Sequence, residues 1–231
     1  MNILVTGASK GIGKVICESL NGNIYATARS EELLSAYENY CVCDLAKREG
    51  MEKLGEYIVK NNIDVLINNA GGYVYSPVEE ISHEQLEQII KLDLEAPLYL
   101  ISKAVPYMKS QKFGRIINIG SISGVMGEAY ASAYSGAKSG LIGATKALAL
   151  ELAPYGITVN TINPGWVNTD MGNFSANEGG FTKEELLECI PQKRFVSPKE
   201  IAGMVKYLLS DVAKGVTGQS INLCAGLTCG C

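Results

Sequence analysis

Residues 114–153 read GRIINIGSISGVMGEAYASAYSGAKSGLIGATKALALELA, and this stretch decides how the chain folds. Residues 115–119 are a short apolar run closed by Gly120, which is typical of a strand buried in a parallel sheet. A glycine-rich loop follows, and then a run of small residues predicts a helix that carries Tyr134 and Lys138. Residues four apart lie one turn apart on the same helix face, so the phenol and the ammonium should face one site beside Ser121.

These three side chains are the types that the interconversion of a ketone and an alcohol requires. Hydride that arrives at a carbonyl carbon leaves charge on the oxygen, and this oxygen needs a proton at nearly the same moment. Tyr134 can give the proton, Lys138 should pull the pKa of the phenol down from about 10, and Ser121 can hold the oxygen. A Tyr-x-x-x-Lys pair also occurs on ordinary surface helices, so the interpretation depends on the strand and the serine before it.

The N-terminus predicts a turn that binds a nucleotide. Residues 2–13, NILVTGASKGIG, form an apolar strand, a glycine-rich turn and the start of a helix that runs to about Leu20. Gly7, Gly11 and Gly13 would let the backbone approach a pyrophosphate at the helix N-terminus. The spacing Gly-x-x-x-Gly-x-Gly differs from the general dinucleotide fingerprint, so this stretch alone could also be an ordinary tight turn.

Composition and charge exclude several classes of protein. The chain has 231 residues, 47% of them hydrophobic, and a formal net charge of -4, which predicts ample core and no basic surface for nucleic acid or anionic membranes. We see no signal peptide and no apolar run of roughly 18 residues, so we expect a cytoplasmic protein without a membrane partner.

The cysteines do not predict a metal site. Seven are scattered along the chain beside one histidine, His83, and the Cys-x-Cys pairs at 41/43 and 229/231 lack further ligands. Alternation along a strand sends the side chains of Cys41 and Cys43 to the same face, where packing in the core or the cleft is expected.

The motifs together resemble the classical short-chain dehydrogenase/reductase family from end to end. They are residues 6–13 (TGASKGIG), residues 68–71 (NNAG), Ser121, the Tyr134 and Lys138 pair, and residues 164–165 (PG). Within the family the chain is most similar to bacterial 3-oxoacyl-[acyl-carrier-protein] reductases. The resemblance implies an α/β fold with a single Rossmann-type domain over residues 1–231. It also implies a seven-stranded parallel sheet with helices on both faces, and a homotetramer or homodimer.

Hydrophobic runs predict the other elements of this fold. Strands are expected at residues 23–28, 40–43, 64–67, 157–162 and 220–223. Helices are expected over 47–61, from an N-cap at Ser82 to Gln111, and from Ser197 and Pro198 onward. The polar, glycine-rich segment 170–191 is longer than an ordinary connection, so we expect a mobile substrate lid with a short helix from Thr182.

The end of the second predicted strand indicates which cofactor binds. An acidic residue there would accept a hydrogen bond from the ribose of NAD, but the chain has Ala28, Arg29 and Ser30, with Lys10 in the glycine loop. Two cations without a carboxylate favour the 2′-phosphate of NADP(H). The resemblance implies further cofactor contacts at Gly7, Ser9, Gly11, Ile12, Gly13, Asp44, Leu45, Asn69, Ala70, Gly71, Tyr134, Lys138, Pro164, Gly165, Val167 and Thr169.

One position departs from the family pattern. The family usually has an asparagine where this chain has Asp93, and that asparagine completes a proton relay to the lysine through a bound water. An ionised carboxylate only accepts hydrogen bonds, whereas an amide also donates them. Asp93 could therefore pair with Lys138, be protonated in a buried site, or still hold the relay water.

We expect an NADP(H)-dependent oxidoreductase that transfers hydride between nicotinamide and a ketone or secondary alcohol, with Ser121, Tyr134, Lys138 and Asp93 as catalytic residues. A 3-oxoacyl thioester is one candidate substrate. Carrier-protein reductases present two basic docking residues, of which Lys112 matches the first while Tyr155 stands at the second. A ketone of a specialised-metabolite or modified-peptide pathway is the alternative substrate. A non-catalytic NADP-sensing or structural protein is the alternative from another class, and the intact Ser-Tyr-Lys set argues against it.

The pocket should be partly apolar, lined by Tyr73, Tyr75, Met126, Tyr130, Trp166 and Phe174.

Overall fold

The computed structural model describes residues 1–180 and 182–229. Cys231, which belongs to the second Cys-x-Cys pair of the sequence, lies outside these residues. Among the described residues, no helix is long and apolar enough to span a membrane.

Seven parallel strands form one sheet in the order β3-β2-β1-β4-β5-β6-β7, as the resemblance implied. The central strands β1, β4, β5 and β6 are buried along almost their whole length, which is typical of a parallel sheet covered on both faces. The strands are β1 Asn2–Thr6, β2 Asn23–Ala28, β3 Asn39–Val42, β4 Val65–Asn68, β5 Gly114–Ile119, β6 Ile157–Pro164 and β7 Ser220–Leu223.

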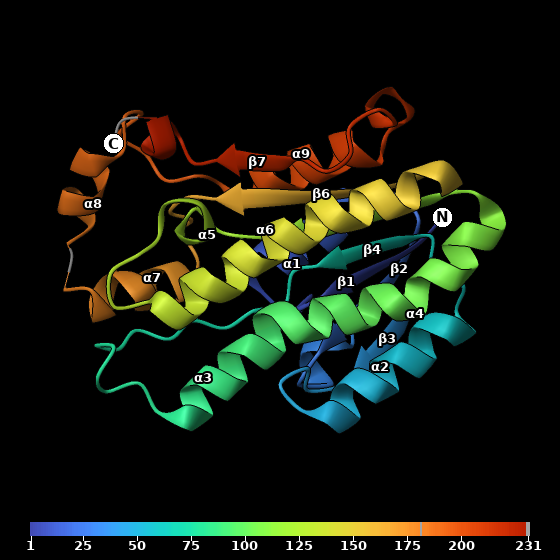
Figure 1. The fold of residues 1–231 in the computed structure, drawn as a ribbon, viewed down its shortest axis with the longest axis horizontal. Helices are drawn as coiled ribbons and strands as arrows, with labels where there is room; N and C mark the ends of the chain where they lie inside the picture. The colour runs from blue at the N-terminus through green and yellow to red at the C-terminus, as the bar shows by residue number, and fades with distance from the viewer. Residues whose placement is uncertain (181, 230–231) are drawn as a thin grey trace.

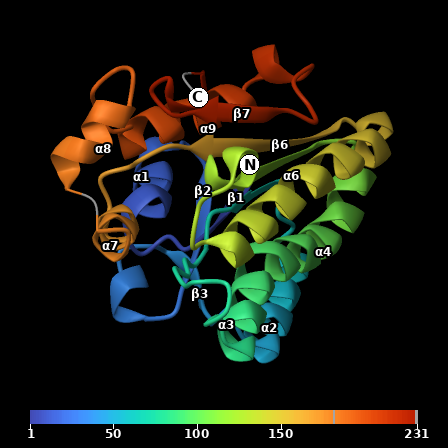
Figure 2. The same cartoon turned by 60° about the vertical axis from the view of Figure 1, so that its left-hand side comes forward.

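Helices cover both faces of the sheet (Figures 1 and 2). One hydrophobic cluster packs α1 and α9 on the first face, and a second packs α2, α4 and α6 on the other. The helices are α1 Gly11–Ser19, α2 Arg48–Lys60, α3 His83–Ile90, α4 Ala96–Gln111, α5 Ser123–Met126, α6 Ser132–Leu152, α7 Asp170–Glu178, α8 Lys183–Cys189 and α9 Pro198–Leu209. Short 3-10 turns lie at η1 Glu32–Leu34, η3 Ala153–Tyr155, η4 Asp211–Ala213 and η5 Leu227–Cys229.

The helical run predicted over residues 82–111 forms, but it is not one regular helix. Ser82 caps α3 through a capping box with Gln85. Residues Lys91–Glu95 then form a π-helical turn, η2, before α4 begins. A π turn holds one extra residue against its neighbours and often marks a functional site. This turn packs on α6 and carries Asp93.

The segment 170–191 contains two helices, of which the sequence predicted only the second. Thr182 begins α8 with a capping box to Glu185, as expected. The additional helix is α7, which begins directly after the loop that follows β6. Because all strands are parallel, the loops after β1, β4, β5 and β6 meet at one edge of the sheet, near α5 and α7 on the left in Figure 1.

Candidate active site

The loops at the carboxyl edge of the sheet surround a cleft of about 1360 Å³. Pockets for small ligands usually have roughly 300–1,000 Å³, so this cleft has room for a dinucleotide and a second reactant. Every catalytic and cofactor residue predicted from the sequence lines it, except Gly13. Of the six predicted pocket side chains, Phe174 alone is outside the lining.

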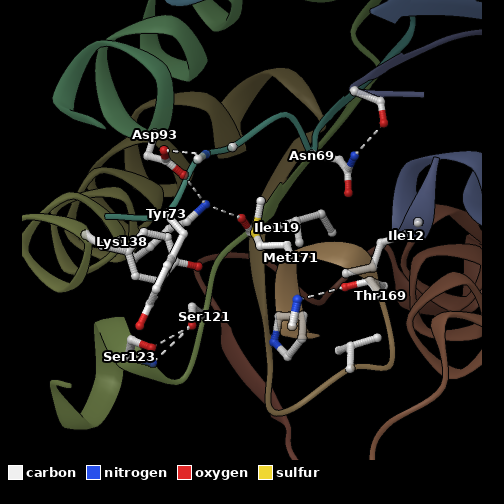
Figure 3. A pocket seen from close by; sticks show the side chains of 18 of the residues that line it. Ile12, Asn69, Tyr73, Asp93, Ile119, Ser121, Ser123, Lys138, Thr169 and Met171 are labelled. Carbon is white, nitrogen blue, oxygen red and sulfur yellow. Dashed lines mark hydrogen bonds and ion pairs between the residues drawn. The ribbon is translucent and has the colours of Figure 1, made fainter. Parts of the chain in front are cut away.

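Gly13 lies behind the glycine loop, where it allows close packing. A Cβ atom at this position would collide with the Gly7 carbonyl oxygen and the Asn69 amide nitrogen. Gly7 itself has a φ of +67°, which L side chains rarely adopt. The Asn69 amide donates to the carbonyl oxygens of Thr6 at 2.8 Å and Gly7 at 3.1 Å, which ties the loop after β4 to the glycine loop (Figure 3).

This arrangement fits a dinucleotide. The described structure shows no side-chain hydrogen bond that caps the N-terminus of α1, and the first helical residues, Gly11 and Ile12, line the cleft, where their N–H groups could serve an anion. A Cβ on Gly7 would lie 3.0 Å from the Cα of Ala70, so a larger residue here would crowd the space between the two loops. The residues present therefore suit a pyrophosphate at this helix end.

The two predicted cations lie differently in the cleft. Arg29 is exposed at the end of β2, lines the cleft, and forms no ion pair with another described residue. The Lys10 ammonium lies 2.7 Å from the carboxylate of Asp170 at the start of α7, and this contact lowers the pKa of Asp170. Both partners are largely exposed, so the pair connects the glycine loop with α7 at little net gain in stability.

The structure brings Ser121, Tyr134 and Lys138 together. Ser121 follows β5, while Tyr134 and Lys138 are buried on α6, with 7% and 5% of their surface exposed. The Lys138 ammonium donates to the Ile119 carbonyl oxygen at 3.0 Å and lies 5.7 Å from the centre of the Tyr134 ring (Figure 3). The end of β5 therefore fixes the lysine beside the phenol.

Asp93 forms a direct ion pair with Lys138. One carboxylate oxygen lies 2.9 Å from the ammonium, and the other accepts a hydrogen bond of 2.9 Å from the Gly72 N–H (Figure 3). Asp93 is fully buried. Burial is the largest single influence and lowers the pKa of Lys138, but Asp93 and Tyr134 together outweigh it, and the pKa of Lys138 is raised. The geometry favours the pair with Lys138, which lowers the pKa of Asp93, but burial is the larger influence and the net effect raises this pKa.

The phenol experiences opposing influences. Burial raises the pKa of Tyr134, and this is the largest effect. Lys138 lowers the pKa, as the sequence predicted, and so does the hydrogen bond with Ser121, while the carboxylates of Asp93 and Glu128 raise it. The net effect raises the pKa of Tyr134. Lys138 lowers this pKa as predicted, but burial outweighs the lysine.

Sequence reasoning missed a group of polar side chains beside Ser121. The Ser123 hydroxyl donates to Glu128 at 2.6 Å, and Tyr73 donates to the other oxygen of the same carboxylate at 2.7 Å. The Tyr73 ring also packs edge-on against Tyr134, with 5.1 Å between the ring centres. The only signal in the sequence was a single acid, Glu128, in the stretch between Gly120 and the predicted helix.

The cysteines pack much as expected. Cys41 and Cys43 are both buried in the second hydrophobic cluster, and Cys43 also lines the cleft. Within the part of the chain that the structure describes, no three His, Cys, Asp or Glu residues gather in a way that could hold a metal ion.

Comparisons with known proteins agree with this geometry. The family model described as enoyl-(acyl carrier protein) reductase matches residues 7–228. The uncharacterized oxidoreductase YxjF of Bacillus subtilis is 39% identical over 97% of each chain. The 3-oxoacyl-[acyl-carrier-protein] reductase FabG of Buchnera aphidicola subsp. Schizaphis graminum is 35% identical over 97% of this chain and 96% of its own.

A solved structure also matches over nearly the whole chain. The crystal structure of a tryptophan variant of actinorhodin polyketide ketoreductase with NADPH has a TM-score of 0.91 and 33% identity, covering 98% of this chain and 96% of that chain. The matched regions include the glycine loop, the Ser-Tyr-Lys set and the loop after β6. The chain therefore belongs to the short-chain dehydrogenase/reductase family of oxidoreductases.

Proposed function

We propose that this protein transfers hydride between NADP(H) and a ketone or secondary alcohol, with acid–base catalysis by Ser121, Tyr134 and Lys138. The observation that carries the proposal is the buried Tyr134 and Lys138 pair, which faces Ser121 in the same cleft as the glycine loop. Bound NADPH would supply the hydride. Ser121 then binds the carbonyl oxygen, Tyr134 gives it a proton, and the Lys138 ammonium stabilises the phenolate left behind.

A 3-oxoacyl thioester is the substrate we favour. The relative from Buchnera is a 3-oxoacyl-[acyl-carrier-protein] reductase, and the matching solved structure is a polyketide ketoreductase. Tyr155 stands where carrier-protein reductases have their second basic docking residue. A cation is nevertheless close by, because the Lys109 ammonium lies 4.6 Å from the centre of the Tyr155 ring. The match to a polyketide ketoreductase also keeps ketones of specialised metabolism as the second candidate.

The experiment is NADPH oxidation, followed by absorbance, with an acetoacetyl thioester and a panel of other ketones. We expect turnover of at least one ketone, with the thioester among the best. Tight NADPH binding without oxidation in the presence of any ketone would instead support the non-catalytic NADP-sensing class.

Two structural proposals accompany this function. We propose that residues 170–191 act as the substrate lid within the single domain, because residues of both α7 and α8 line the cleft. We also propose a homotetramer or homodimer, which is supported by Leu150 on α6 and Val212 in η4, each with more than 80% of its surface exposed.

Arg29→Ala should weaken NADPH binding about tenfold or more and leave NADH binding nearly unchanged. The expected reason is the loss of a charge-assisted hydrogen bond to the 2′-phosphate, because Arg29 has no other charged partner in the described structure, whereas Lys10 is paired with Asp170. Dissociation constants for both cofactors check this, with Arg48→Ala on the exposed start of α2 as the matched control. Equal losses for NADPH and NADH would show that Arg29 does not recognise the phosphate.

A further inference from the structure

A chain of hydrogen bonds leads from Ser121, beside the phenol, to a carboxylate at the wall of the cleft. Ser121 lies close enough to lower the pKa of the Tyr134 phenol, and both side chains line the same cleft. The Ser121 hydroxyl donates to the Ser123 hydroxyl at 3.0 Å (Figure 3). Ser123 in turn donates to a Glu128 carboxylate oxygen at 2.6 Å. Ser121 follows β5, Ser123 begins α5, and Glu128 lies in the loop before α6, so three consecutive segments build this chain.

The carboxylate of Glu128, at the end of the chain, fixes the direction in which each hydrogen bond is donated. A serine hydroxyl has one proton to donate, and an ionised carboxylate can only accept. Because Ser123 gives its proton to Glu128, it accepts from Ser121, and Ser121 in turn can accept from the phenol. The backbone N–H of Ser123 also donates to the Ser121 oxygen at 3.1 Å, which keeps the two serines in register.

The surroundings of Glu128 hold the carboxylate in place. Tyr73, from the loop after β4, donates to its second oxygen at 2.7 Å, so both oxygens are engaged. The titratable groups that face it are Tyr73 and, through the two serines, Tyr134 on α6, with Lys138 and Asp93 beyond the phenol. Glu128 is only half-buried at the cleft wall, so its carboxyl group can exchange protons with water.

The other side of the phenol offers less freedom for proton movement. Two of the three N–H groups of Lys138 are directed at Asp93 and at the Ile119 carbonyl oxygen. Asp93 is fully buried. The carboxylate that pairs with the lysine therefore has no direct contact with solvent, unlike Glu128.

We propose that Glu128 is the terminal positioning residue of a proton wire, Tyr134 to Ser121 to Ser123 to Glu128, which resets the protonation state of the phenol between turnovers. The proposal rests on the proposed function. In alcohol oxidation the Tyr134 O–H bond breaks, each serine passes its own proton onward, and Glu128 gains one proton that it releases to water. No electrons move in this step, and in ketone reduction the same protons move in reverse. The wire works while Ser121 is not bound to the substrate oxygen.

The kinetic test is the pH profile of kcat for oxidation of a 3-hydroxybutyryl thioester with NADP⁺. Glu128→Gln keeps the shape of the side chain but cannot take up a proton. We expect its kcat to fall about tenfold where the carboxylate is ionised, which is below the usual effect of a direct acid or base, and to approach the wild-type value in acid. Ser123→Ala breaks the wire and should give the same loss, whereas Glu56→Gln, on the exposed face of α2, is the matched control.

Two kinetic outcomes would overturn the proposal. A loss by the same factor at every pH would mean that Glu128 only supports the loop. A wild-type profile for Ser123→Ala would mean that no proton passes through this serine.

A second measurement needs no substrate, so it separates the wire from the proposed function. Carbon-13 NMR can follow the Glu128 carboxyl signal, which is assigned by its absence in Glu128→Gln. The chemical shift of this signal at neutral pH should change in Ser123→Ala, because the carboxylate loses a donor, and should change less in Tyr134→Phe, which removes the far end of the chain. If no ketone is turned over, the proposed function fails and this signal decides alone. An unchanged signal in Tyr134→Phe would show that the chain is not continuous.

Discussion

Tyr134→Phe should abolish ketone reduction while leaving NADPH binding nearly intact. The substitution removes the phenol hydroxyl but keeps the ring, which packs against Tyr73 at 5.1 Å between ring centres. Loss of a general acid lowers the rate by about 100- to 10,000-fold. Steady-state kinetics with an acetoacetyl thioester gives the loss in kcat, and the NADPH dissociation constant is measured on the same protein.

A matched variant separates the acid from general damage. Tyr107→Phe removes the same hydroxyl on α4, outside the residues that line the cleft, and should keep the wild-type rate. Thermal unfolding of both variants should show similar stability, because each keeps its ring. A Tyr134→Phe protein that turns over ketone at the wild-type rate would refute the acid–base role of the phenol.

The sequence could predict the sheet and the meeting of Ser121, Tyr134 and Lys138 in one cleft, because both depend on short-range patterns. Each buried strand is an apolar run followed by a turn, and parallel strands deliver their C-terminal loops to one edge. Tyr134 and Lys138 share a helix face by spacing alone, and Ser121 ends the strand before them. These local relations do not depend on how more distant parts of the chain pack.

The contacts that the sequence could not predict join residues without a shared period. The π turn at Lys91–Glu95 differs from an α-helix by one residue of hydrogen bonding, and its apolar spacing does not reveal the change. The sequence therefore could not show which of the three possible roles Asp93 has. Lys10 and Asp170 lie 160 residues apart in the chain. Their ion pair depends on α7, which begins at Asp170, and the polar sequence of α7 does not clearly predict a helix.

Asp93→Ala should destabilise the protein by about 3–5 kcal/mol, because it leaves the buried Lys138 ammonium without its partner. Asp93→Asn keeps an acceptor oxygen near the ammonium and the same side-chain shape, so its loss in stability should be smaller. Unfolding in urea, compared at neutral pH, gives both values. Glu49→Ala, on the exposed face of α2, is the control for removal of an acid that has no ion pair in the described structure.

The pH dependence of this stability follows from the sign of the shift at Lys138. Its pKa in the folded protein lies above the ordinary value of about 10.4. The stabilisation from the charged lysine is therefore present in full below that ordinary value and is lost as the pH rises through the raised pKa. Through Lys138, the difference in unfolding free energy between wild type and Asp93→Asn should shrink in strong alkali.

The same pair should set the alkaline limit of catalysis. When Asp93 is replaced by asparagine or alanine, burial remains as the main influence on Lys138 and lowers its pKa. Because the phenolate needs the ammonium beside it, the rate of ketone reduction in both variants should decline at a lower pH than in wild type. At its optimum, Asp93→Asn should stay within about tenfold of wild type, or roughly 1.4 kcal/mol of barrier, since Ser121, Tyr134 and Lys138 remain. Identical pH–rate profiles at full activity in wild type, Asp93→Asn and Asp93→Ala would mean that Asp93 has no part in catalysis.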